Sequence, residues 1–231
     1  MKNKYAALLF RTFSLVLLPL LPLHSFADVS VIKKNNLKNT NVEYAKIVYI
    51  GEVTEGKTVD VMSSLDEINA LYPNVKRIYF YINSYGGDMD SGYMTYEAVK
   101  SSPTPITTVN MSMVASAATL FYCAASERQT MSGSSFILHP AAASNSRSNY
   151  LKPDEVNMLQ QMNNTYNNMF DTIYQRCTSY TDDERKKILY SESTRELINA
   201  KQALEKKMAT AITEKTINVD VSYYITEKET H

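Results

Sequence analysis

Short apolar runs alternate along the chain with segments whose apolar residues recur at helical spacing. Four runs are rich in β-branched and aromatic residues, as strands are: residues 45–50, 75–82, 106–109 and 135–138. Residues 59–72 and 91–100 instead repeat apolar side chains at the helical period, with Met94, Ala98 and Val99 of the second segment expected to face inward. Because strands and helices alternate in this order, the pattern predicts βαβ units around a parallel sheet, an α/β fold.

The second half of the chain is predominantly helical in pattern. The alanine-rich residues 115–125 predict a close-packed helix, and a long helix begins at Pro153 with acidic residues in its first turn. Residues 181–184 resemble a capping box that starts another helix. A further helix is expected over residues 200–211, and residues 217–225 alternate as a final strand.

The first 27 residues have the three-part pattern of a secretory signal peptide. Three basic residues precede an apolar core at residues 13–22, and Ser25 and Ala27 occupy the −3 and −1 positions of a cleavage site. The apolar core is too short and too rich in proline for a membrane span, so we expect an exported protein, periplasmic or secreted. Residues 28–231 are expected to form a single domain, since no repeat or linker divides them, with residues 28–41 as a mobile leading segment.

Charge and composition exclude several functions. Loss of residues 1–27 leaves 21 basic and 24 acidic residues, a net charge of −3, which argues against binding to nucleic acid. No later apolar segment predicts a membrane span, and no metal or other cofactor is expected. Cys123 and Cys177 are the only cysteines and lack metal-ligand spacing. An exported compartment permits a disulfide between them, while two free buried thiols fit the sequence equally well.

His139 is the only candidate for an internal general base near neutral pH. His24 lies in the predicted signal peptide and His231 is the last residue of the sequence. His139 follows the apolar run 135–138, and a side chain at the end of a strand can be held rigidly. A structural histidine that caps the strand is the alternative, because catalysis also requires a partner within hydrogen-bond reach.

Ser116 is the candidate nucleophile, since it lies among small residues at the predicted start of a helix. A serine at this position is commonly an N-cap, which is the structural alternative. A functional serine there would lie beside free backbone N–H groups that can stabilise an oxyanion. The sequence has no G-x-S-x-G motif around it, which disfavours an α/β-hydrolase.

The glycine pair Gly86-Gly87 lies between a predicted strand and a predicted helix. Glycine lets backbone N–H groups approach a bound carbonyl closely, as in an oxyanion hole or a peptide-binding strand edge. An ordinary strand-to-helix turn is the alternative. A phosphate-binding loop is disfavoured, because no G-K-[ST] sequence follows.

Together these motifs resemble the Clp protease proteolytic subunit family. Three motifs occur in the family's order and spacing, Tyr81-Ile82-Asn83-Ser84-x-Gly86-Gly87, Ala115-Ser116 and Ile137-Leu138-His139, and the resemblance covers residues 46–203. It implies the ClpP/crotonase-like fold of repeated ββα/βαβ units, with a long helix after the central sheet. It also implies ring-shaped homo-oligomers built partly through that helix, and a peptide or unfolded protein as substrate.

The resemblance also assigns roles to residues. It implies that Ser116 is the nucleophile and His139 the base, and that the backbone N–H groups of Gly87 and Ala117 form the oxyanion hole. Extended peptide would lie along the strand edge after Gly86-Gly87. The family's acidic third member aligns near Ser191, where the neighbouring carboxylate is Glu192.

The sequence departs from the family at three further positions: Tyr85 replaces a proline, Ser112 a glycine and Pro140 a glutamine. We interpret the chain as an exported serine peptidase that acts on peptides or unfolded proteins without coupling to ATP. The alternative is a non-catalytic protein of the same fold that binds peptides or assembles, and lacks the triad acid. A crotonase-like acyl-transfer enzyme is disfavoured, because coenzyme A thioesters are not expected outside the cytoplasm.

Overall fold

The structure is a computed structural model that describes residues 28–143 and 150–227. The predicted signal peptide, residues 1–27, lies outside the described residues. Within them, nine strands form one sheet in the order β1-β9-β2-β3-β4-β5-β8, and β6 pairs with both β4 and β7. The strands are β1 (Asp28–Lys33), β2 (Tyr44–Ile50), β3 (Arg77–Ser84), β4 (Ile106–Ala115), β5 (Glu127–Met131), β6 (Ser135–Leu138), β7 (Glu196–Asn199), β8 (Ala211–Thr213) and β9 (Val221–Thr226).

The helices alternate with the central strands and then follow them. They are η1 (Asn39–Asn41), α1 (Glu55–Leu71), α2 (Met89–Ser101), α3 (Ala118–Tyr122), α4 (Pro153–Cys177), α5 (Asp182–Ile188), η2 (Glu192–Thr194) and α6 (Ala200–Glu205). β2, β3, β4 and β5 run parallel, with α1 and α2 as the first two crossover helices. The predicted α/β fold with βαβ units is therefore confirmed.

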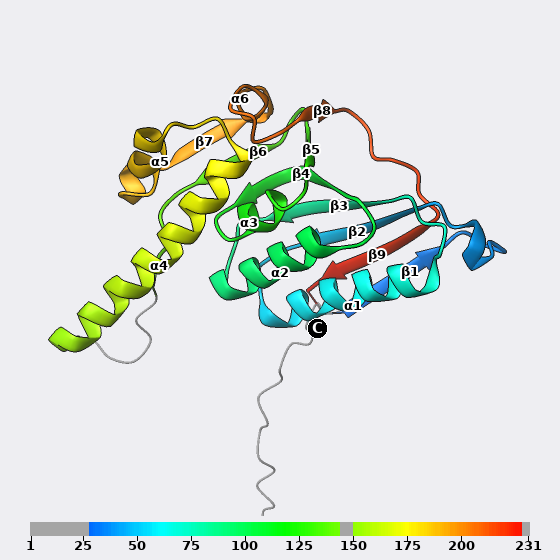
Figure 1. Cartoon of the computed structure of the whole chain (residues 1–231), viewed down its shortest axis with the longest axis horizontal. Coiled ribbons are helices and arrows are strands. Elements are labelled where there is room, and N and C mark those ends of the chain that lie inside the picture. The colour runs from blue at the N-terminus through cyan, green and yellow to red at the C-terminus, as the bar shows by residue number, and fades with distance from the viewer. Residues whose placement is uncertain (1–27, 144–149, 228–231) are drawn as a thin grey trace, which may run out of the picture.

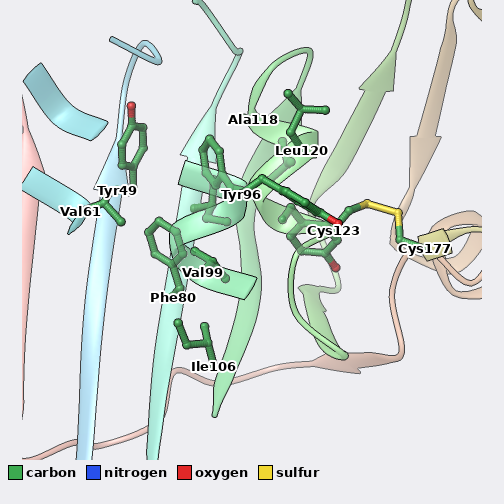
Figure 2. Close-up of a cluster of buried hydrophobic side chains, with 14 of the residues drawn as sticks. Tyr49, Val61, Phe80, Tyr96, Val99, Ile106, Ala118, Leu120, Cys123 and Cys177 are labelled. Carbon is green, nitrogen blue, oxygen red and sulfur yellow. A yellow bond between two sulfur atoms is a disulfide. The ribbon is translucent and has the colours of Figure 1, made fainter. Parts of the chain in front are cut away.

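The main hydrophobic core lies between the sheet and a layer formed by α1, α2 and α3 (Figure 1). Phe80 of β3 and Leu120 of α3 are fully buried within it (Figure 2). The opposite face of the sheet carries a smaller cluster around Tyr81, whose hydroxyl accepts a hydrogen bond from the N–H of Ile217 at 2.9 Å. Both faces of β3 are thus covered, which explains its nearly continuous run of apolar residues.

α4 packs against the rest of the molecule mainly through its C-terminal half, from Tyr166 onward. Its buried residues are Phe170, Ile173, Tyr174 and Cys177. Its N-terminal end projects away from the sheet (Figure 1), and Val156, Met158 and Met162 are exposed there. None of the helices in the two described ranges is both long enough and apolar enough to cross a bilayer.

A disulfide joins Cys123, which ends α3, to Cys177, the last residue of α4 (Figure 2). Their Cα atoms lie 5.6 Å apart, within the range that a disulfide spans. The sequence left open whether the two thiols are paired, and the structure pairs them. The disulfide therefore links the C-terminal end of α4 covalently to the end of α3.

Three predictions about the first half of the chain were wrong. Residues 28–41 do not form a loose leader, because residues 28–33 form β1, which pairs antiparallel with β9. The strand predicted at 106–109 continues to Ala115, since Val114 and Ala115 pair with β6. That extension shortens the alanine-rich helix to the five residues of α3. Met94, expected to face inward, is exposed.

Two further predictions fail in the second half. The helix expected over residues 200–211 ends at Glu205, and Lys207 then adopts a left-handed conformation with φ 58°. The chain continues into β8, which pairs with β5. The final strand predicted at residues 217–225 is shorter at its start, and it lies inside the sheet between β1 and β2. In contrast, the capping box predicted at Thr181 is present at the start of α5.

Candidate active site

Ser116 lies at a sharp turn between β4 and α3. Its N–H donates to the carbonyl of Ile137 at 3.2 Å, which extends the pairing of β4 with β6 by one residue. Its backbone then adopts a left-handed conformation with φ 52°. This conformation is uncommon for a residue other than glycine, and such local strain concentrates at functional sites. The serine is not the N-cap of α3, because Ala117 occupies that position.

Two side chains support the strained turn. The N–H and the hydroxyl of Thr119 both donate to the carbonyl of Ser116, at 2.9 and 2.6 Å. The Thr119 hydroxyl has used its single proton, so the Tyr174 hydroxyl 2.8 Å away donates to it. Burial raises the pKa of Tyr174, which keeps that proton in place. The buried end of α4 thereby supports the carbonyl of Ser116.

Gly86 packs directly against Ser116. A Cβ atom at Gly86 would lie 2.4 Å from Cβ of Ser116 and 2.9 Å from the carbonyl oxygen of Ala115. The backbone of Gly86 has φ 100°, a conformation that L side chains rarely adopt. Glycine is therefore required here on two independent grounds, close approach and backbone conformation.

Val53 fixes the neighbouring peptide of Gly87. The N–H of Val53 donates to the carbonyl of Gly86 at 2.8 Å, and the N–H of Asp88 donates to the carbonyl of Val53 at 2.9 Å. In this parallel bridge the residue between the two bonds, Gly87, directs its own N–H away from Val53. Among the described residues, the N–H groups of Gly87 and Ala117 donate no hydrogen bond. Gly87 is exposed, so its N–H is open to a carbonyl oxygen, whereas Ala117 is fully buried.

His139 follows β6, the strand that pairs in parallel with the end of β4. The carboxyl ends of these two neighbouring strands therefore carry Ser116 and His139. Glu192 begins η2, just before β7, and β7 pairs antiparallel with β6 through Leu138 and Glu196. That pairing returns the chain to the end of β6, where Oε2 of Glu192 lies 3.2 Å from Nδ1 of His139.

The contact between His139 and Glu192 is close but poorly aligned. The two atoms are within ion-pair distance, yet the buried Nδ1 atom forms no hydrogen bond, so only the ion-pair contact is supported. Oε1 of Glu192 also accepts a hydrogen bond from Arg195 at 2.8 Å. Across residues 28–143 and 150–227, no hydrogen bond joins Oγ of Ser116 to His139. Catalytic hydrogen bonds are often long or misaligned before substrate binds.

The structure thus brings the predicted residues into two contacting pairs, Gly86 with Ser116 and His139 with Glu192. Val53, Thr119 and Tyr174 were not predicted from the sequence, because Val53 acts through backbone hydrogen bonds and Thr119 and Tyr174 act through two buried hydroxyl groups. Within the described ranges, no group of three or more histidine, cysteine, aspartate or glutamate residues could hold a metal ion.

The sheet topology and the strand-end site define an α/β protein of the ClpP/crotonase-like class. A mutant of ClpP1 from Listeria monocytogenes has a similar fold, with a TM-score of 0.59 and 18% identity over 74% of this chain and 91% of that chain. The profile of the family described as Clp protease matches residues 33–216. This chain belongs to the Clp protease family.

Curated relatives match a shorter part of the chain. The ATP-dependent Clp protease proteolytic subunit 2 of Treponema pallidum is 31% identical over 100 residues, 42% of this chain and 50% of the relative. The protein of the same name from Treponema denticola is 31% identical over 96 residues, 41% of this chain and 48% of the relative. The chain therefore spans about half the length of the curated relatives it matches.

Proposed function

We propose that this chain is an exported serine peptidase that hydrolyses peptide bonds in peptides or unfolded proteins. Membership of the Clp protease family supports the reaction class. The observation that carries the proposal is the placement of Ser116 and His139 at the ends of neighbouring strands, with Glu192 against His139. The Nδ1 atom of His139 lies 3.2 Å from Glu192, and Ser116 lies at the end of the adjacent strand.

In the proposed reaction, Oγ of Ser116 attacks the peptide carbonyl and passes its proton to Nε2 of His139. Glu192 faces the other ring nitrogen, so it favours the tautomer with Nδ1 protonated and stabilises the imidazolium that forms. His139 then returns the proton to the leaving amine, and water hydrolyses the acyl-enzyme. The N–H groups of Gly87 and Ala117 stabilise the oxyanion.

The proposed substrate is an extended peptide whose scissile carbonyl reaches the exposed Gly87. The strand edge predicted after Gly86-Gly87 was wrong, because Asp88 directly caps α2. The curated relatives are named as subunits of an ATP-dependent protease. For an exported chain we propose hydrolysis that is not coupled to ATP. The pairing of Cys123 with Cys177 supports export, because disulfides persist in oxidising compartments.

The proposed assembly is a ring-type homo-oligomer in which α4 contacts neighbouring copies. The C-terminal half of α4 packs within the subunit, while Val156, Met158 and Met162 nearer its N-terminus expose apolar surface. A second copy would remove this surface from water.

Hydrolysis of fluorogenic peptidyl aminomethylcoumarins and of fluorescein-labelled casein tests the proposal. We expect Ser116→Ala and His139→Ala each to lower kcat by about 10⁴-fold or more, since both residues take part in the covalent step. Ser112→Ala is the matched control, because Ser112 lies on the same strand but is exposed. Peptidase activity that survives Ser116→Ala would contradict the proposal.

A non-catalytic peptide-binding protein is the second candidate function. The absence of a hydrogen bond between Ser116 and His139 across the described ranges favours it, as does the poor alignment of Nδ1 with Glu192. On this alternative, labelled casein binds the wild-type chain and Ser116→Ala with equal affinity and remains uncleaved. Fluorescence anisotropy measures binding and gel electrophoresis measures cleavage in the same samples.

A further inference from the structure

Glu227, directly after β9, anchors the end of that strand. Its Oε1 accepts a hydrogen bond from Nζ of Lys57 at 2.9 Å and another from the N–H of Glu52 at 3.1 Å. Lys57 also donates to the carbonyl of Ile50 at 2.9 Å. The carboxylate therefore links the end of β9, the first turn of α1 and the segment between β2 and α1.

Lys57 holds the buried end of this link, while the Glu227 side chain is 61% exposed. The residue is only 1% exposed, and a buried ammonium requires charged and hydrogen-bonded partners. Lys57 also lies 5.4 Å from the ring centroid of Tyr49, whose hydroxyl donates to the carbonyl of Glu52 at 2.9 Å. The hydrogen bond from Lys57 lowers the pKa of Glu227, so the carboxylate stays charged at neutral pH. The peptide groups on both sides of Glu52 are thus held.

Glu52 and Val53 form one segment, and this segment also holds the glycine loop, residues 86–88. Val53 follows Glu52, and its N–H and carbonyl bond to Gly86 and Asp88. A Cβ atom at Gly87 would lie 2.3 Å from the carbonyl oxygen of Val53, so the loop and Val53 cannot move independently. A displacement of Glu52 therefore moves the glycine loop.

We propose that Glu227 is a positioning residue that sets the direction of the Gly87 N–H through Glu52 and Val53. The catalytic part of this proposal rests on the proposed function, in which that N–H stabilises the oxyanion. Glu227 touches no reacting atom. Its loss misdirects a donor that acts mainly in the transition state, so kcat falls while KM changes little.

The other end of β9 provides a matched control. Asp220, just before the strand, pairs with Lys34 at 2.9 Å and accepts hydrogen bonds from the N–H groups of Glu43 and Tyr44 at 2.9 and 3.1 Å. Both acids bond to backbone N–H groups beside β2, Asp220 at the start of that strand and Glu227 just after its end. Because β9 and β2 run parallel, only Glu227 lies at the carboxyl end of β2, on the side of the candidate site.

The test compares Glu227→Ala, Glu227→Gln and Asp220→Ala in the full-length chain, with fluorogenic peptides as substrate. We expect Glu227→Ala to lower kcat about tenfold with KM within about twofold, less than the roughly 10²–10³-fold loss when an oxyanion donor is removed. Glu227→Gln should retain more activity, because its amide oxygen still accepts both hydrogen bonds. Asp220→Ala should leave kcat unchanged.

Amide hydrogen exchange of the peptide that covers residues 84–90 gives a readout independent of activity. Glu227→Ala should speed exchange there and Asp220→Ala should not. Unchanged exchange in Glu227→Ala, or equal acceleration in both variants, would overturn the positioning role. If the wild-type chain hydrolyses no peptide, the proposed function fails, while the exchange result still decides this inference. If Glu227→Ala does not fold, Glu227→Gln is compared with Asp220→Asn in the same way.

Discussion

The two halves of the candidate site are held by different forces. The serine half consists of Ser116, Gly86 and Ala117, in which Gly86 packs against Ser116 and both Gly86 and Ala117 are buried. In the histidine half, the side chains of His139 and Glu192 are 21% and 59% exposed and meet through one poorly aligned contact.

This difference indicates that the fold alone positions the serine half, whereas the histidine half needs a further contact to align. Backbone packing leaves the serine half almost no freedom, since even one added methyl group at Gly86 would collide with Ser116. The acid of the histidine half is shared with Arg195 and screened by solvent. We therefore expect the serine half to be preformed, and the histidine half to align when substrate or a neighbouring subunit covers it.

Gly86→Ala should have the largest effect, because it breaks the serine half. The new Cβ would lie 2.4 Å from Cβ of Ser116, on a backbone with φ 100°. We expect peptide hydrolysis to fall by at least about 10²-fold and the free energy of unfolding by about 2–4 kcal/mol. Urea unfolding and initial rates measure the two effects. Gly56→Ala is the control, since nothing lies within 4 Å of its Cβ position in α1, and it should stabilise by up to about 1 kcal/mol.

Glu192→Gln tests the histidine half. We expect kcat to fall by about 10–10²-fold, less than the roughly 10⁴-fold loss seen when a buried triad acid is replaced, because Glu192 is exposed and poorly aligned. Arg195→Ala removes the competing partner of Glu192 and should leave kcat equal or higher. A fall in kcat for Glu192→Gln as large as that for Ser116→Ala would show that the histidine half is positioned as firmly as the serine half. An unchanged kcat would remove Glu192 from the mechanism.

The disulfide supports the serine half from the side of α4. It joins cysteines 54 positions apart in the sequence, and its removal should lower the free energy of unfolding by about 2–4 kcal/mol. Urea unfolding of the wild-type chain with and without dithiothreitol measures this loss. The Cys123→Ser/Cys177→Ser variant should not respond to the reductant. Identical unfolding of the wild-type chain in both conditions would show that its thiols are free.

Tyr174→Phe should have a smaller effect on the same half. The change removes one buried hydrogen bond to Thr119, so we expect a loss of about 1 kcal/mol in stability and a modest fall in kcat. Tyr166→Phe is the control on the same helix, since its hydroxyl bonds to Asp90 at an exposed position. Equal losses in the two variants would exclude a special role for the relay to Ser116.

Acid should loosen the part of the chain that carries Glu192. In α5, a hydrogen bond from Lys206 lowers the pKa of Glu184 to about 2 from its usual 4.5. The contact therefore stabilises the fold above about pH 4.5 and loses its effect as the pH falls toward 2. The stability difference between wild-type and Glu184→Gln should be present at pH 7 and vanish near pH 2. A difference that does not depend on pH would contradict this assignment.

The sequence predicts the centre of the fold well, because apolar periodicity reports burial directly. The run 135–138 coincides with β6, and the two-sided apolar pattern of β3 reflects its two covered faces. Edge elements escape prediction because they depend on distant partners. β1 is a short strand that leads into a largely polar segment and pairs with β9, while β7 is four residues long with Leu197 exposed.

The site was predictable only as a set of strand-end residues. His139 and the glycine pair each follow a predicted strand, and Ser116 lies at the predicted start of a helix, so the sequence places all of them at the ends of predicted elements. The left-handed backbone of Ser116 was not predictable, since alanine-rich sequence favours helix and the register with β6 overrides that preference. The contact of Glu227 with Glu52 joins residues 175 positions apart and leaves no local pattern.

The site of reaction with a fluorophosphonate probe tests the central claim, that Ser116 is a nucleophile activated by His139. Peptide mapping by mass spectrometry of the labelled full-length chain should place the adduct on Ser116. Labelling should be abolished in Ser116→Ala and strongly slowed in His139→Ala. An adduct on another residue, or labelling that survives Ser116→Ala, would contradict the account.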